Sequence, residues 1–117
     1  MKQSEVPMAK GLLLAWSSPV SDESDTEFNS WYEGTHIPQV RAAIASVTAV
    51  HRYRTADLPG AQQPAHRYLA VYEMDSADMP AAVASLGQAR GEGHLDMTAT
   101  MDVTANPPVL QWYQAAE

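Results

Sequence analysis

With 117 residues, 45% of them hydrophobic, the chain has the length and composition of one globular domain. Seven Lys and Arg against fourteen Asp and Glu give a net charge of -7, which argues against nucleic acids and anionic membranes as partners. Cysteine is absent, which excludes disulfides, thiolate metal sites and a cysteine nucleophile.

The N-terminal residues 1–9 are polar and follow no periodic pattern, so we expect a flexible tail ahead of a single domain over residues 10–117. Residues 11–17 form a short apolar run closed by Ser18 and Pro19, which is typical of a strand buried on both faces. The longest apolar run, Leu12 to Trp16, is far too short to cross a membrane. We therefore expect a cytoplasmic protein.

The next predicted element is a helix. Residues 21–25 supply N-cap side chains and first-turn carboxylates, both of which favour a helix start. Pro38 disfavours α geometry at Ile37, which predicts a kink there before the helix continues over residues 40–44. Helical spacing places five residues on one inward face: Phe28, Trp31, Tyr32, Thr35 and His36.

Two β-rich segments follow and predict a hairpin around a loop at residues 57–64. The first, residues 47–55, alternates His51 and Tyr53 on one face with Arg52 and Arg54 on the other. The second covers residues 67–74. Strand, helix and hairpin together give the first two thirds of the chain a β-α-β-β order.

The last third predicts a second helix over residues 81–89, a short strand near residues 98–103 and a final strand over residues 108–114. The main order β-α-β-β-α-β predicts an α+β, ferredoxin-like fold: a four-stranded antiparallel sheet with two helices on one face. The other face of such a sheet is left uncovered, and its apolar residues need a cover. We therefore expect a homodimer in which two sheets pack face to face.

At this point a set of motifs resembles a known group of proteins. The motif Trp-Tyr-x-x-Thr-His-Ile-Pro at residues 31–38, with Arg52-Tyr53-Arg54, Tyr68 to Tyr72 and the terminal Trp112-Tyr113, resembles the dimeric α-β barrel superfamily, nearest to its EthD-like branch. The resemblance covers roughly residues 10–113. That superfamily includes cofactor-free polyketide cyclases, small quinone-forming monooxygenases, lactone isomerases, haem-binding members and proteins without known activity. The resemblance implies a dimeric α-β barrel with one cavity per subunit and leaves the reaction open.

His36 is the first candidate for chemistry, because an imidazole can take or give a proton near neutral pH. The resemblance places this residue at the pocket wall. The alternative is a structural histidine whose ring nitrogens bind the carbonyls freed at the kink. Tyr32 lies one turn earlier and could donate a hydrogen bond to an oxyanion, or could be an aromatic residue of the core.

His51 and Tyr53 could project into a common cavity with Tyr68 or Tyr72 from the neighbouring strand. Their face could equally be the dimer interface, where Tyr is enriched. Arg52 and Arg54, on the opposite face, suit surface carboxylates better than a substrate carboxylate. Aromatic side chains are expected to shape the substrate-binding wall: Trp16, Phe28, Trp31, Tyr68, Tyr72 and Trp112.

His94 occupies, by resemblance, a place similar to that of a catalytic histidine in the plant olivetolic-acid-type cyclase; the alternative is an exposed loop histidine. The four histidines lack metal-ligand spacing and phosphate-binding motifs are absent, so we expect no metal or nucleotide. No cofactor is predicted, although one axial histidine, His36 or His94, would suffice for haem. His66 has no evident companion and is assigned no role.

Together these features favour a small cofactor-independent enzyme of secondary metabolism, such as antibiotic biosynthesis, that cyclises a polyketide-like or phenolic intermediate. In this hypothesis His36 is the general acid or base, with Tyr32 and Tyr53 stabilising enolate charge. Two alternatives stay open: a cofactorless monooxygenase of a phenolic substrate, and a non-catalytic dimer that binds a small hydrophobic or aromatic ligand.

Overall fold

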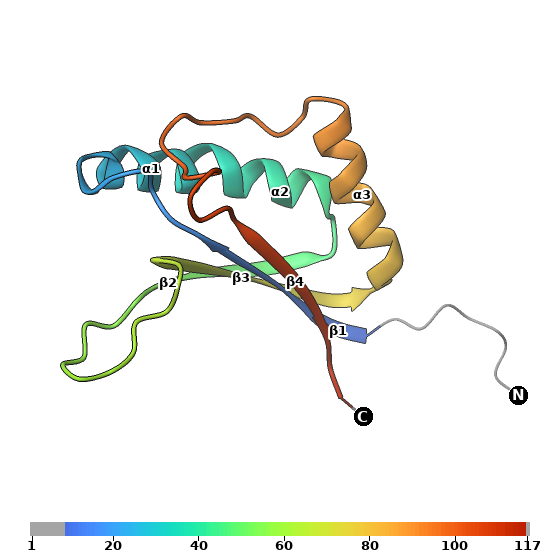
Figure 1. Ribbon diagram of the computed structural model, residues 1–117. Helices are drawn as coiled ribbons and strands as arrows, with labels where there is room; N and C mark the ends of the chain where they lie inside the picture. The colour runs from blue at the N-terminus through green and yellow to red at the C-terminus, as the bar shows by residue number, and fades with distance from the viewer. Residues whose placement is uncertain (1–8, 117) are drawn as a thin grey trace, which may run out of the picture.

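A four-stranded antiparallel sheet carries the helices on one face (Figure 1). The computed structural model describes residues 9–116; the predicted tail, except Ala9, lies outside the described residues. The strands stand side by side in the order β2-β3-β1-β4. This confirms the predicted α+β, ferredoxin-like order of elements, whose bounds are β1 Ala9–Ser17, α1 Asp25–Trp31, α2 Ile37–Ala43, β2 Val47–Arg54, β3 Tyr68–Ala77, α3 Met79–Gly91 and β4 Val109–Gln114.

The two faces of the sheet differ in what covers them. On β1, Leu13 and Ala15 point toward the helices and are buried, while Leu12 and Leu14 alternate onto the other face and are half-buried. The core between sheet and helices is dominated by four fully buried side chains: Tyr32, Tyr72, Phe28 and Leu13. Within residues 9–116 no helix covers the other face, which we call the open face (Figure 1).

The helical layer contains a π-helical segment, Tyr32–His36, between α1 and α2. The expected departure from α geometry at Ile37 is wrong, since φ is -59° and ψ is -47° there. Pro38 is instead accommodated by the π segment before it, where the Ile37 N–H donates to the Tyr32 carbonyl five residues earlier. Pro38 is then the second residue of α2, directly after the π segment.

The predicted short strand near residues 98–103 is also wrong. The segment between α3 and β4, orange to red in Figure 1, lies on the helix side of the sheet and forms only an isolated bridge between Pro19 and Met101. β1 is already paired on both edges, with β3 and β4, so this segment has no edge of β1 to join. Among residues 9–116, none of the helices has the length and apolar character that crossing a membrane requires.

Candidate functional site

A cavity of about 410 Å³ lies between the helix-facing side of the sheet and the helices. This volume falls in the range of pockets that bind small organic molecules, roughly 300 to 1,000 Å³. The segment between α3 and β4 forms one wall through Leu95, Met97 and Met101. The other walls come from the sheet (Leu13, Ala15, Trp16, Ser17, Tyr72, Leu110), from the first helical layer (Trp31, Tyr32, His36, Val40) and from α3 (Leu86, Arg90).

The wall segment is tied down at both ends of the cavity. Near its start, the Asp96 N–H donates to Gln39 Oε1 over 2.7 Å. Further along, the Val20 N–H donates to the Thr100 carbonyl over 2.7 Å. These bonds fix an otherwise irregular stretch over the site, so the cavity is bounded by ordered backbone.

His36 lies in the helical wall of this cavity. Its imidazole stacks on the Trp31 indole, with ring centroids 4.8 Å apart, and meets the Tyr32 ring edge-on at 4.9 Å. Burial, together with the smaller effects of the positive charges of Arg90 and Arg52, lowers the pKa of His36 to about 4. The imidazole is therefore neutral at physiological pH and can accept a proton.

The alternative role for His36, binding carbonyls freed before Pro38, gains no support from its contacts. The Nδ1 atom is buried and has no hydrogen-bond partner among the residues that the structure describes. The kink that would have freed those carbonyls is replaced by the π segment.

Three hydroxyl-bearing residues, Ser17, Tyr32 and Tyr72, line the same cavity as His36, and the Tyr32 hydroxyl lies close to those of the other two. Burial raises the pKa of Tyr32, against smaller lowering effects of the Tyr72 hydroxyl, the Arg52 charge and the Ser17 hydroxyl. Burial also raises the pKa of Tyr72, and the neighbouring Tyr32 raises it further. Both phenols thus stay protonated and can donate hydrogen bonds.

Unpartnered polar atoms concentrate on the cavity wall. Within the described residues, Ser17 Oγ, Trp31 Nε1, His36 Nδ1 and Tyr72 Oη are buried without a well-oriented hydrogen bond, and all four residues line this cavity. Leaving a buried polar group unpaired costs roughly 1–3 kcal/mol.

Arg52 supports the site from the side of β2. Its guanidinium carbon lies 4.3 Å from the centroid of the Tyr32 ring and 4.9 Å from that of Tyr68. Nη1 donates to Asn29 Oδ1 over 2.7 Å and to Glu33 Oε2 over 3.2 Å. Arg52 therefore has the carboxylate partner that we expected, but its side chain is only 12% exposed, so it is no surface residue.

The expected common cavity of His51 and Tyr53 with Tyr68 or Tyr72 is wrong. β2 pairs His51 with Val71 and Tyr53 with Leu69, and these residues lie on the open face. Tyr68 and Tyr72 alternate with them and are buried toward the helices. This register is compatible with the alternative prediction, in which His51 and Tyr53 lie on a face that forms a dimer interface.

On the open face, His51 Nε2 lies 3.0 Å from Glu73 Oε2, with both side chains 49% exposed. His94 lies outside the cavity on an exposed turn, with its Nδ1 3.8 Å from Glu92 Oε1. We therefore place neither histidine in the candidate site.

The predicted aromatic wall is partly assembled at the cavity. Trp31 and Tyr72 line it, and Trp16 borders it at the end of β1. The others pack next to it in the core: the Phe28 and Tyr68 rings lie 5.6 Å apart, and Trp112 packs partly buried against the core.

Comparison with solved structures identifies the fold. An EthD-like protein from Ralstonia eutropha matches with a TM-score of 0.57 at 18% identity, over 92% of this chain and 93% of that one. An ethyl tert-butyl ether D (EthD) family protein from Bacillus halodurans matches with a TM-score of 0.53 at 16% identity, over 93% of this chain and 100% of the other. The chain has the fold of the EthD-like proteins.

A dimeric ferredoxin-like protein of unknown function from Thermobifida fusca aligns with a TM-score of 0.46 at 14% identity, over 98% of this chain and 99% of that one. No protein-family model and no curated protein matches the sequence. The EthD-like resemblance seen in the motifs is thus confirmed at the level of fold.

Two wall residues of the cavity were not predicted from the sequence. Leu13, Ala15 and Ser17 are alternate residues of β1 and point to its helix-facing side. This spacing of two residues could have predicted that Ser17 lines the cavity. Arg90 follows Leu86 by one turn of α3, so both side chains share the face toward the cavity. A charged residue that continues an apolar helical stripe is the signal that could have found Arg90.

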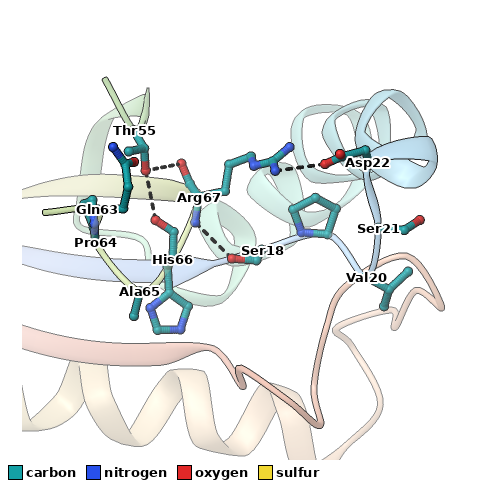
Figure 2. A pocket seen from close by; sticks show the side chains of 11 residues that line it. Ser18, Val20, Ser21, Asp22, Thr55, Gln63, Pro64, Ala65, His66 and Arg67 are labelled. Carbon is teal, nitrogen blue, oxygen red and sulfur yellow. Dashed lines mark hydrogen bonds and ion pairs between the residues drawn. The ribbon is translucent and has the colours of Figure 1, made fainter. Parts of the chain in front are cut away.

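A second pocket in the EthD-like fold, of about 390 Å³, lies where the β2–β3 loop meets the end of β1 (Figure 2). Its charged groups are already paired with neighbours: Arg67 Nη2 donates to Asp22 Oδ1 over 2.9 Å, and the Arg67 N–H donates to Ser18 Oγ over 2.9 Å. His66 Nε2 donates to the Pro107 carbonyl over 2.8 Å. These bonds fasten loops together, and we place the function in the larger cavity.

Proposed function

We propose that the protein is a cofactor-independent enzyme of secondary metabolism that cyclises a polyketide-like or phenolic intermediate by general acid–base catalysis. The observation that carries this proposal is that His36, whose buried Nδ1 has no hydrogen-bond partner in the described residues, lines the same mainly apolar cavity as Tyr32 and Tyr72. A neutral imidazole beside neutral phenols is a base next to hydrogen-bond donors. Those are the parts that enolisation of a carbonyl compound requires.

In the first step, neutral His36 accepts a proton from a carbon next to a carbonyl of the bound substrate. The substrate becomes an enolate and His36 becomes an imidazolium. Burial opposes the imidazolium in the free protein, but the enolate beside it supplies the compensating negative charge. Proton transfer by such a positioned group contributes ~10²- to 10⁴-fold to a rate.

In the second step, the enolate carbon attacks another carbonyl of the same molecule, and a carbon–carbon bond closes the ring. The negative charge moves to the attacked oxygen, which takes the proton back from His36. Atoms and electrons balance in this intramolecular aldol addition without an oxidant or a further reactant. Hydrogen bonds from Tyr72 and Tyr32 to the charged oxygens lower the barrier, because the donors are already in place.

The cavity contributes by holding the reacting carbons close together. Leu13, Val40 and Leu86 supply apolar surface, and Trp31 supplies a flat aromatic face. Fixing two reacting groups within one cavity removes much of the entropic part of the barrier.

We further propose that the enzyme acts as a homodimer joined through the open face. Leu14 and Val71 lie opposite each other there, with Tyr53 and Tyr113 more than half exposed nearby on the flanking strands. A sheet face of this kind is a liability in a monomer, and a second copy would bury it. The cavity lies on the other side of the sheet, so each subunit would keep its own site.

The experiment is turnover of linear poly-β-keto thioesters by the purified protein, with products identified by mass spectrometry in air and without dioxygen. The proposal predicts cyclic products of the substrate's mass, or of that mass minus water, at equal rates in both atmospheres. Products that gain oxygen would show the monooxygenase instead. Tight binding without turnover, unchanged in His36→Gln, would show the accessory binding protein and overturn the proposal.

A further inference from the structure

The cavity has one feature that the proposed chemistry does not use, the guanidinium of Arg90. Arg90 lies in the last turn of α3, one turn after Leu86, and both residues line the cavity. Its positive charge reaches His36, whose pKa it lowers. Arg90 and His36 thus line the same cavity.

Arg90 lacks a carboxylate partner in the described part of the chain. The ion pairs there are made by His51, Arg52, Arg67 and His94. Lys10, Arg41 and Arg54 likewise make no ion pair in the described residues, but of these four basic residues only Arg90 lines the cavity. Asp96 also lines the cavity, but its carboxylate is not within ion-pair distance of Arg90.

We propose that Arg90 binds the carboxylate of an acidic substrate, so that the enzyme selects polyketide-like or phenolic acids over their neutral analogues. An arginine fork matches a carboxylate with two parallel hydrogen bonds. The apolar body of such an acid would lie against Leu13, Val40 and Leu86, with its charged end at the rim beside Arg90. This inference rests on the proposed function in that both place the substrate in this cavity.

Two nearby features set the limits of this assignment. An arginine in the last turn also stabilises its own helix, because the C-terminal carbonyls carry partial negative charge. Asp96 at the same rim repels a carboxylate and weakens the attraction. The test therefore compares an acid with its uncharged analogue, a difference that a purely structural arginine would not affect.

The experiment measures binding of 6-hydroxy-2-naphthoate and of 6-hydroxy-2-naphthamide by calorimetry near neutral pH. These two compounds have the same ring system and differ in charge. We expect the Arg90→Gln variant to bind the acid at least about tenfold more weakly than the wild type, because a charge-assisted pair is lost. Binding of the amide should change less than about twofold. The control is Arg41→Gln, an exposed arginine in the last turn of α2 that does not line the cavity, which should change neither affinity.

An equal loss for acid and amide in Arg90→Gln, no change for either, or no binding of either compound to the wild type would overturn the inference. Selective loss of the acid supports it even if no thioester is cyclised. That combination would overturn the proposed reaction alone, so the two failures are distinguishable.

Discussion

The imidazole of His36 stacks on the indole of Trp31 with an angle of 22° between the rings. The two residues are five positions apart, and in an α-helix five positions correspond to about 140° of rotation, so their side chains would diverge. The π segment between them pairs residues five apart and brings both onto one face. Pro38, by lacking an N–H, favours this local geometry and so sets the orientation of the proposed base.

The lowered pKa of His36 predicts a pH-dependent stability. Between the usual pKa of 6.5 and the folded value of about 4, the unfolded chain binds the proton more tightly, so the free energy of unfolding falls as the pH falls. The full effect is up to about 3 kcal/mol near pH 4. In urea unfolding, the free energy of unfolding of His36→Gln should lack this pH-dependent decrease, whereas that of the exposed-site control His94→Gln should retain it. Parallel pH profiles for the wild type and His36→Gln would contradict the assignment.

Removing the Tyr72 hydroxyl should raise stability while lowering activity. The hydroxyl is buried without a well-oriented hydrogen bond in the described residues, so Tyr72→Phe relieves a cost and should gain about 1 kcal/mol in urea unfolding. Loss of a donor to the enolate oxygen should slow turnover by about 10²-fold. A destabilised variant with full activity would show that the hydroxyl is structural.

Arg52 should contribute to stability far more than its neighbour Arg54. Replacing Arg52 by Ala removes the contacts with the Tyr32 and Tyr68 rings and the hydrogen bond to Asn29, which together predict a loss of about 2 kcal/mol. The exposed Arg54→Ala control should stay within about 0.5 kcal/mol of the wild type. Equal unfolding midpoints for the two variants would refute the supporting role of Arg52.

A charge on the open face should separate the proposed dimer. Leu14 pairs with Val71 in the middle of that face, so Leu14→Glu would bury a carboxylate at the interface. Analytical ultracentrifugation should show a dimer for the wild type and a folded monomer for Leu14→Glu. The control Val83→Glu, on an exposed position of α3, should remain dimeric. A monomeric wild type would rule out the open face as a stable interface.

Most of the fold follows from local patterns in the sequence. The apolar run of β1, the capping residues before α3 and the alternation in β2 each reflect short-range physics; for example, the Asp78 carboxylate accepts the Ala81 N–H as a helix cap should. The predicted strand near residues 98–103 failed because the chain is held there by long-range bonds to Ser18 and Val20, which no local pattern reveals.

The candidate site was only partly predictable. His36, Tyr32 and Trp31 share one short motif, and α-helical spacing correctly placed Tyr32 and His36 on one face; the π segment that aligns His36 with Trp31 was not anticipated. Which strand face meets the helices depends on the pairing register, and this decided that Tyr72 is in the cavity and His51 is not. Arg90 was missed because its position depends on how α3 packs against the sheet.

The most direct test of the central claim is hydrogen–deuterium exchange at carbon 1 of 2-tetralone, an aromatic ketone of a size that the cavity can hold, followed by NMR in deuterated buffer. Catalysis of this exchange requires only the first step of the proposed reaction, in which a base removes a proton from carbon. The account predicts that the wild type accelerates exchange and that His36→Gln loses ~10²- to 10⁴-fold of this acceleration, while His94→Gln keeps it. Exchange at the same rate with the wild type and with His36→Gln would contradict the claim that His36 transfers the proton.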